Sequence, residues 1–310
     1  MLKQTDIIIP VYRPTKKLFT LLDRLKEQTV EVNHIYLINT EQSYFDILTV
    51  GTDFWRRYRN VTVEHISKRE FDHGNTRRQA VKKSESPYFV MMTDDAIPAD
   101  NTMLEKLLAP VWEGRAAVSY ARQLPDENCG VIERFTREFN YPGESRLKNS
   151  GDLPKLGIKA FFASNVCAAY DRSIYDKLDG FVKRTIFNED MILARKVIDA
   201  GYSIAYAAEA RVIHSHNYTG KQQFKRNFDL GVSHAQFPGV FSNLQTEGEG
   251  VRLVKKTAGY LISVKKPWLI FKLLWQSGCK YTGYLLGKNY RLLPVFCIRH
   301  FSMNREYWKF

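Results

Sequence analysis

Strand-like and helix-like segments alternate four times between Asp6 and Met92, and this alternation restricts the fold more than any other feature of the sequence. Each strand-like segment is a short apolar run, as expected of a strand that is buried on both faces. Because a parallel strand pair needs a crossover connection, the pattern predicts βαβ units and a doubly wound, mostly parallel α/β sheet. The expected strands are 6–11, 34–39, 61–66 and 88–92, and the expected helices are 16–28, 45–59 and 74–83.

The rest of the chain up to Gln236 contains the same two kinds of segment in a less regular order. Residues 124–159 are polar, rich in Pro and Gly and weakly periodic, so we expect loops and short helices that shape a pocket. Gly201 follows one expected helix directly, as glycine often does at a helix end. The further expected helices are 101–111, 191–200 and 219–236, and the further expected strands are 117–123, 161–170, 203–208 and 210–213.

Two carboxylates follow the fourth expected strand, because the apolar run 88–92 stops at Thr93-Asp94-Asp95. Open α/β sheets bind ligands in the crevice beyond the carboxyl ends of their strands. Carboxylate oxygens suit a hard divalent cation such as Mg²⁺ or Mn²⁺. The alternative is a turn with solvated Asp side chains, which is the commoner role of an isolated Asp-Asp pair. No GxGxxG follows the first strand, so a nicotinamide or flavin Rossmann site is not expected.

The cysteine pattern and the hydropathy of the chain favour a cytoplasmic protein. Four widely separated cysteines without a CxxC pair exclude a Cys-rich zinc module and indicate reduced thiols. They are Cys129, Cys167, Cys279 and Cys297. The first residues run directly into a strand and contain no secretory apolar region. No uncharged apolar segment approaches the roughly 20 residues that a spanning helix needs.

The formal net charge of +13 lies almost entirely in the last sixty residues. Residues 251–310 contain twelve Lys and Arg against one acid, a net of +11 that leaves about +2 for the first 250 residues. Apolar residues at helical spacing lie among these cations: Val251, Val254, Ala258 and Leu261, then Trp268, Phe271 and Trp275. We therefore predict an α/β domain in residues 1–240 and an appendage of basic amphipathic helices in residues 241–310.

Basic amphipathic helices with aromatic anchors suit an anionic membrane surface, where apolar burial and electrostatic attraction add together. The alternative is that the apolar stripes pack on the α/β domain or in a homo-oligomer. A basic, aromatic tail also raises the alternative of nucleic-acid binding. That alternative leaves the acidic motifs unexplained, so we expect no nucleic-acid partner and a location at the inner face of the cell membrane.

Five short motifs follow one another along the chain: Ile7-Ile8-Ile9-Pro10-Val11-Tyr12, Phe71-Asp72-His73-Gly74-Asn75-Thr76-Arg77, Thr93-Asp94-Asp95-Ala96-Ile97-Pro98, Asn188-Glu189-Asp190 and His214-Ser215-His216-Asn217-Tyr218. Their order resembles that of family 2 glycosyltransferases with the GT-A fold, and more narrowly that of bacterial rhamnosyltransferases. The resemblance covers residues 5–240 and rests on the order of the motifs, since each one alone is weak. It implies transfer of a sugar from a nucleotide-linked donor.

The resemblance implies a metal site at Asp95, which takes the place of the second Asp of the family's Asp-x-Asp motif. Thr93 departs from that motif; its hydroxyl can bond to a ribose or a phosphate but is a poorer metal ligand. Of His214 and His216, which point to opposite sides if their segment is extended, we expect His216 to approach the metal or the diphosphate. The alternative for either histidine is a surface or core position.

The resemblance also implies roles for Asn188-Glu189-Asp190 at the mouth of the acceptor pocket. Asp190 corresponds to the base that takes the acceptor proton, and Glu189 orients the base or the acceptor. The alternative is a helix N-terminus, where Asn and acidic residues are favoured without any catalytic role.

Several residues correspond to the nucleotide-binding side of the family's site. Pro10 and Tyr12 match the wall beside the nucleotide base, and Asn39 replaces the usual acidic residue after the second strand, with Glu41 close behind. Gly74 and Arg77 match a loop that contacts the nucleotide, with Arg77 as a diphosphate partner or, alternatively, a solvated helix residue. Thr93 and Asp94 complete the expected nucleotide-sugar contacts.

The resemblance as a whole implies an inverting, Mg²⁺- or Mn²⁺-dependent rhamnosyltransferase that uses dTDP-rhamnose. The expected acceptor is a lipid-linked saccharide in cell-wall or surface polysaccharide synthesis. The Gln-x-x-Arg-Trp signature of processive synthases is absent after Asp190, which favours the addition of a single residue. The alternatives are a catalytically silent glycosyltransferase-like subunit at the membrane and a transferase for another nucleotide sugar.

Overall fold

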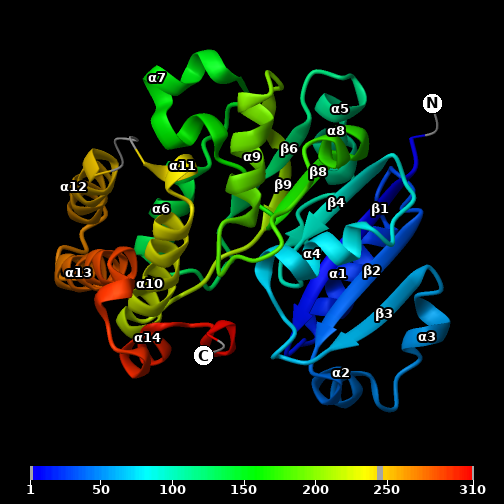
Figure 1. The fold of residues 1–310 in the computed structure, drawn as a ribbon, viewed down its shortest axis with the longest axis horizontal. Helices are drawn as coiled ribbons and strands as arrows, with labels where there is room; N and C mark the ends of the chain where they lie inside the picture. The colour runs from blue at the N-terminus through cyan, green and yellow to red at the C-terminus, as the bar shows by residue number, and fades with distance from the viewer. Residues whose placement is uncertain (1–2, 243–246, 309–310) are drawn as a thin grey trace.

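The computed structural model describes residues 3–242 and 247–308, and its centre is a mixed β-sheet (Figure 1). The strand order is β3-β2-β1-β4-β8-β6-β9-β5, and β7 also pairs with β9. Strands β1, β2, β3 and β4 pair with one another in parallel, whereas β8 is antiparallel to both β4 and β6. The strands are β1 Thr5–Tyr12, β2 His34–Thr40, β3 Val61–Ile66, β4 Tyr88–Met92, β5 Ile97–Pro98, β6 Val118–Leu124, β7 Arg146–Lys148, β8 Cys167–Asp171 and β9 Ile204–Ile213.

Helices connect the strands and form the C-terminal part of the chain. The α-helices are α1 Lys17–Lys26, α2 Gln42–Thr49, α3 Phe54–Arg57, α4 His73–Val81, α5 Met103–Trp112, α6 Val131–Asn140, α7 Leu153–Leu156, α8 Arg172–Lys177, α9 Glu189–Asp199, α10 Gly220–Gln236, α11 Pro238–Phe241, α12 Glu247–Ser263, α13 Leu269–Lys288 and α14 Val295–Phe301. Short 3₁₀ turns occur at Ser150–Asp152, Gly157–Phe161, Tyr290–Leu292 and Arg305–Tyr307.

The alternation of side chains along β1 explains why helices cover both faces of the sheet. Ile7 and Ile9 share one core with buried residues of α1 and α5. Ile8 belongs to a second core with buried residues of α4 and α9. Successive side chains of a strand point to opposite faces, so the continuous apolar run of β1 needs a helical layer on each side. The predicted doubly wound α/β fold is confirmed.

The structure differs from the expected elements at three places. The strand expected at 161–170 begins only at Cys167, because Gly157–Phe161 forms a 3₁₀ turn. The single helix expected over residues 45–59 is wrong: the chain forms α2 and α3, with Gly51 at a φ of 72° between them. The break lets Phe45 and Phe54, each 1% exposed, enter the same core. The two strands expected at 203–208 and 210–213 are one strand, β9, with an irregular register opposite Ala121 and Arg122 of β6.

The C-terminal helices lie beside α10, on the side of the molecule away from β1, β2 and β3 (Figure 1). Helix α13 packs closely along α10, and added Cβ atoms at Gly283 and Gly287 would lie 2.3 Å and 2.0 Å from carbonyl oxygens of α10. Farther along, Ile298 and Trp308 share a small core with Phe228 of α10. The inner faces of these helices therefore pack on the α/β domain.

The outer faces of the same helices carry large exposed apolar side chains. Trp268, Phe271 and Trp275 of the predicted stripe are 63%, 80% and 69% exposed. The stripe on α12 is divided, because Val251 is 57% exposed while Leu261 is buried. Among the residues that the structure describes, no helix combines the length and the apolar character needed to cross a membrane.

Replacing Gly287 by Ala should destabilise the fold, because the new methyl group would collide with the Phe228 carbonyl of α10. Overpacking of this kind costs about 1–3 kcal/mol. Gly278→Ala is the matched control on the same helix, since nothing lies within 4 Å of its added Cβ. Alanine there should stabilise α13 by up to about 1 kcal/mol. Thermal unfolding of both variants tests this, and equal melting temperatures would contradict the close contact of α10 and α13.

Candidate active site

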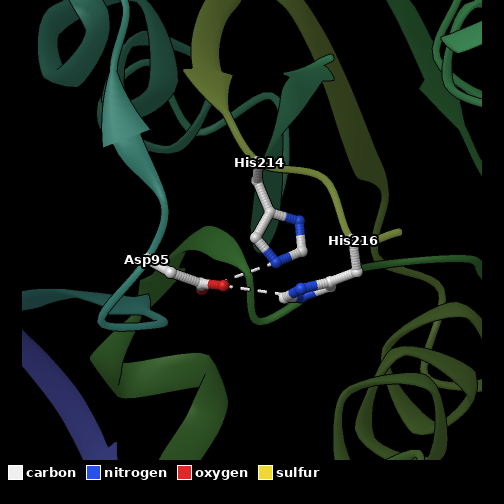
Figure 2. Close-up of side chains that lie close together, drawn as sticks. All are labelled: Asp95, His214 and His216. Carbon is white, nitrogen blue, oxygen red and sulfur yellow. Dashed lines mark ion pairs between the residues drawn. The ribbon is translucent and has the colours of Figure 1, made fainter. Parts of the chain in front are cut away.

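Three side chains that could ligate a metal ion meet at one edge of the sheet (Figure 2). Asp95 follows β4, and its carboxylate lies 3.5 Å from Nε2 of His214 and 3.4 Å from Nε2 of His216. Both histidines follow β9. The pairing of β5 with the end of β9, which places Ile97 opposite Ile213, brings the two segments together. We call these three residues the metal cluster, and their potential ligand atoms all lie within 4.8 Å of one another.

A hydrogen-bond network orients the ring of His214. The Oε1 atom of Gln123 accepts from Arg137, while its Nε2 donates to Tyr141 and Ser164. The His214 Nδ1 atom, 3.0 Å from that Oε1, is therefore the donor. Nε2 is then unprotonated, and its lone pair faces the Asp95 carboxylate. A cation bound between them would be ligated by both.

Burial also keeps the two imidazoles neutral. It lowers the pKa of His214 to about 3, although the Asp95 carboxylate acts in the opposite direction. Burial lowers the pKa of His216 as well, again against the effect of Asp95. Neutral imidazoles and a carboxylate are a donor set that fits a divalent ion. Because imidazole is a softer ligand than oxygen, the set suits Mn²⁺ better than Mg²⁺.

His214 and His216 would point to opposite sides only in an extended segment, and the segment is not extended here. The segment after Ile213 is no longer a strand, so both rings turn toward Asp95 and lie edge to face at 4.7 Å. Asp94 is separate from the cluster: burial and the neighbouring Asp95 raise its pKa to about 7, partly opposed by the Tyr12 backbone. The Thr93 hydroxyl is buried and has no hydrogen-bond partner among the described residues.

The second group is the carboxylate pair, Glu189 and Asp190, in the first turn of α9. Glu189 is buried, and its Oε1 lies 3.1 Å from Nε of Arg77, an ion pair between α9 and α4. Asn165 donates to the same oxygen, and His73 lies 3.8 Å from the other. Asp190 is only half-buried; it accepts from the backbone of Asn165 at 2.9 Å.

The pKa values of the two adjacent carboxyls shift in opposite directions. Burial raises the pKa of Glu189, but the Arg77 charge, helped by His73 and Asn165, outweighs it and lowers the pKa below its ordinary value. Burial, followed by the negative charge of Glu189, raises the pKa of Asp190 to about 7. Glu189 is therefore a fixed anion, whereas Asp190 can gain or lose a proton near neutral pH.

The expected nucleotide-binding residues lie where β1 and β2 end. Tyr12 is 40% exposed and meets Tyr44 edge to face, with Arg13 and Lys68 over its ring. Asn39 is buried beside the end of β2; its amide donates to the Glu41 carbonyl, while Oδ1 has no partner among the described residues.

The remaining expected contacts have local structural roles. Pro10 pairs with Ile38 inside the sheet, and the Glu41 side chain accepts from the backbone of Lys68 at 2.5 Å. Gly74 is packed against Val182, whose carbonyl would lie 2.2 Å from an added Cβ, so only glycine fits there.

Arg77 has a partner that the sequence did not indicate. The alternative of a solvated helix residue is wrong, because Arg77 is 6% exposed and paired with Glu189. Three supporting residues, His73, Gln123 and Asn165, were not singled out from the sequence. His73 belongs to a motif that carries the resemblance, but Gln123 and Asn165 have no local signal, since only the fold brings them to these sites.

These features define a class of protein. Residues 6–179 match the model of glycosyl transferase family 2, and the chain belongs to this family. It is thus a glycosyltransferase.

The chain is 37% identical over 304 residues to the O-antigen chain rhamnosyltransferase RfbN of Salmonella typhimurium, an alignment that covers 97% of this chain and 95% of that protein. It is also 37% identical over 305 residues to the O-antigen chain rhamnosyltransferase WbaN of Salmonella anatum, with 97% and 95% covered.

Two solved structures share the fold. The mannosyltransferase PcManGT from Pyrobaculum calidifontis, solved with GDP-Man and Mn²⁺, is 13% identical with a TM-score of 0.56, covering 98% of this chain and 84% of that one. TarS of S. aureus, solved with UDP-GlcNAc, is 14% identical with a TM-score of 0.51, covering 93% and 91%. With the family match, these likenesses show the predicted GT-A fold.

Asp95→Asn should weaken Mn²⁺ binding by at least about tenfold, because it removes the only charged member of the metal cluster. Calorimetric titration with manganese chloride measures the change. His300→Gln, which alters an exposed histidine on α14, is the control and should bind Mn²⁺ like the unaltered protein. Undiminished Mn²⁺ binding by Asp95→Asn would disprove the assignment of the cluster.

Proposed function

We propose that the chain transfers rhamnose from dTDP-rhamnose to a lipid-linked saccharide in surface polysaccharide synthesis, by a single metal-dependent displacement with inversion. The near full-length similarity to two O-antigen chain rhamnosyltransferases supports the sugar and the pathway class. The mechanism rests on the chemistry of two groups. The metal cluster is suited to a cation, and the carboxylate pair contains a carboxyl with a pKa of about 7.

The metal cluster would hold Mg²⁺ or Mn²⁺ against the donor diphosphate. A bound cation there would neutralise charge that develops on the leaving diphosphate. Tyr12 and its aromatic neighbour Tyr44 would face the nucleotide base, with Asn39, Glu41 and the Thr93 hydroxyl as polar contacts. The complex of the mannosyltransferase PcManGT with GDP-Man and Mn²⁺, which has the same fold, is compatible with this arrangement.

Asp190 would be the general base. Its carboxylate takes the proton of the acceptor hydroxyl as the acceptor oxygen bonds to the anomeric carbon of the donor. The bond between that carbon and the diphosphate breaks, and dTDP leaves. Glu189 is held by Arg77 and serves as a fixed negative charge that raises the proton affinity of Asp190. One base without a protein nucleophile corresponds to inversion at the anomeric carbon.

A lipid-linked acceptor requires the enzyme to work at a membrane surface. The exposed aromatic residues of α13 lie among Lys265, Lys266 and Lys272, which are also exposed. We propose that this outer face docks peripherally on the anionic inner face of the cell membrane. Each Lys or Arg near such a surface contributes about 1 kcal/mol.

Release of nucleoside diphosphate from a panel of nucleotide sugars tests the proposed donor. With Mn²⁺ and a lipid-linked saccharide acceptor, dTDP-rhamnose should give the fastest release. A clear preference for another sugar would replace the proposed donor. No turnover of any donor would favour the catalytically silent subunit.

Asp190→Asn should reduce transfer by about 10²-fold or more, because the amide cannot accept the proton. In the unaltered enzyme the rate should rise as the pH increases through about 7, since only the ionised Asp190 is a base. This rise should be missing in the variant, while donor binding is retained. Rates between pH 5.5 and about 8.5 measure both effects.

Glu189→Gln is the informative comparison, although it leaves Arg77 buried without its partner and lowers stability by about 3–5 kcal/mol. If a folded Glu189→Gln loses transfer while Asp190→Asn keeps it, Glu189 is the base instead.

Replacing Trp268 and Phe271 together by Ser should weaken binding to liposomes that contain anionic lipid. Both side chains are exposed, so the fold should be unaffected. Trp55→Ser, which removes a Trp that is 60% exposed on α3, is the matched control. Flotation measures binding of each protein. A chain ending at Gly250 is a poorer test because it uncovers α10. Equal flotation of the double variant and the control would refute docking through α13.

A further inference from the structure

Arg226 of α10 lies between the metal cluster and the carboxylate pair. Its guanidinium carbon is 5.9 Å from the ring centroid of Tyr218, which stacks on His216 of the metal cluster. On the other side the same carbon is 4.6 Å from the ring of Phe187. Phe187 meets His73, the neighbour of Glu189. A continuous row of aromatic contacts therefore places this cation between the two halves of the site.

The position of Arg226 follows from the start of α10. Thr219 caps the helix and forms a capping box with Gln222, which fixes where the first turn begins. Arg226 lies in the second turn of this helix, which begins at Gly220. Because the loop from His214 to Tyr218 leads directly into this helix, the metal cluster and Arg226 are held by one short stretch of chain.

Lys280 of α13 brings a second cation to the same region. The Gln276 side chain, one turn earlier, donates to the carbonyl of Tyr218 at 3.0 Å. An added Cβ at Gly220 would lie 3.1 Å from the Cys279 sulfur, so this face of α13 touches the loop that carries His216. Burial lowers the pKa of the half-buried Lys280, and Arg226 and Arg137 lower it further against Glu133.

Within residues 3–242 and 247–308, Arg226 and Lys280 make no ion pair, whereas Arg137 is paired with Glu133 at 2.8 Å. Arg226 is exposed, and among the described residues its guanidinium makes ring contacts and no hydrogen bond, so its N–H groups are available to a ligand. Cations without an ion-pair partner at a partly buried site favour binding of an anion.

We propose that Arg226 and Lys280 bind a diphosphate ester next to the metal cluster. A guanidinium fork fits phosphate oxygens in a bidentate manner, and an ammonium adds a point charge. Arg226 lies outside residues 6–179, so this assignment comes from the packing of α10 and α13 and not from the family match. It deepens the proposed function, on which it rests, by naming the groups that hold the diphosphate.

A diphosphate ester can come from two sources, the nucleotide donor or the lipid-linked acceptor. The probes are therefore dTDP and, for the lipid side, geranyl diphosphate. Binding of each is titrated by calorimetry in the presence of Mn²⁺, with dTMP as the probe that has one phosphate fewer. The variants are Arg226→Gln, Arg226→Lys and Lys280→Gln. Lys221→Gln, which removes one exposed charge from the same helix, is the matched control.

Arg226→Gln should weaken binding of at least one diphosphate by roughly tenfold or more, and of dTMP by less. Arg226→Lys should recover part of the loss, and Lys280→Gln should show a smaller loss than Arg226→Gln. Lys221→Gln should bind like the unaltered protein. A loss confined to dTDP assigns the site to the donor, and a loss confined to geranyl diphosphate assigns it to the acceptor.

Two outcomes would overturn the proposal, and they can be told apart. If the unaltered protein binds dTDP but Arg226→Gln and Lys280→Gln bind both diphosphates equally well, the diphosphate site is wrong and the proposed function stands. If the unaltered protein binds none of dTDP, UDP and GDP, the proposed function fails together with this site.

Discussion

The buried ion pair between Arg77 and Glu189 is the interaction on which the candidate site depends. Two charges are costly to bury unless they are paired, and here the pair joins the second turn of α4 to the first turn of α9. Because Arg77 keeps Glu189 ionised, the negative charge of Glu189 adds to burial in raising the pKa of Asp190 to about 7. One structural contact thus shifts the pKa values of two adjacent carboxyls in opposite directions.

The sheet topology explains why the members of the metal cluster lie together at one edge of the sheet. Strand β4 ends before Asp95, and β9 ends before His214. The short pairing of β5 with β9 joins these two ends, although about 120 residues separate them along the chain. Gln123 at the end of β6 then fixes the donor atom of His214. The ends of β4, β6 and β9 therefore supply both the ligands and the group that orients one of them.

The C-terminal helices have two faces with different environments. The inner face of α13 packs so closely on α10 that Gly283 and Gly287 are required, and the charges of Arg226 and Arg137 act on Lys280. The outer face keeps Phe271 and neighbouring aromatic residues in solvent.

The sequence by itself determined the α/β class, most element positions and the residues at strand ends, because periodicity and strand-terminal polar residues are local signals. It also carried the family resemblance through five motifs, including those with Asp95 and Asp190. Only the tertiary structure decided that His214 joins His216, that Arg77 pairs with Glu189, and that Arg226 stands between the two groups. These contacts join residues far apart in the chain, and pKa shifts depend on burial and on neighbouring charges that no local pattern encodes.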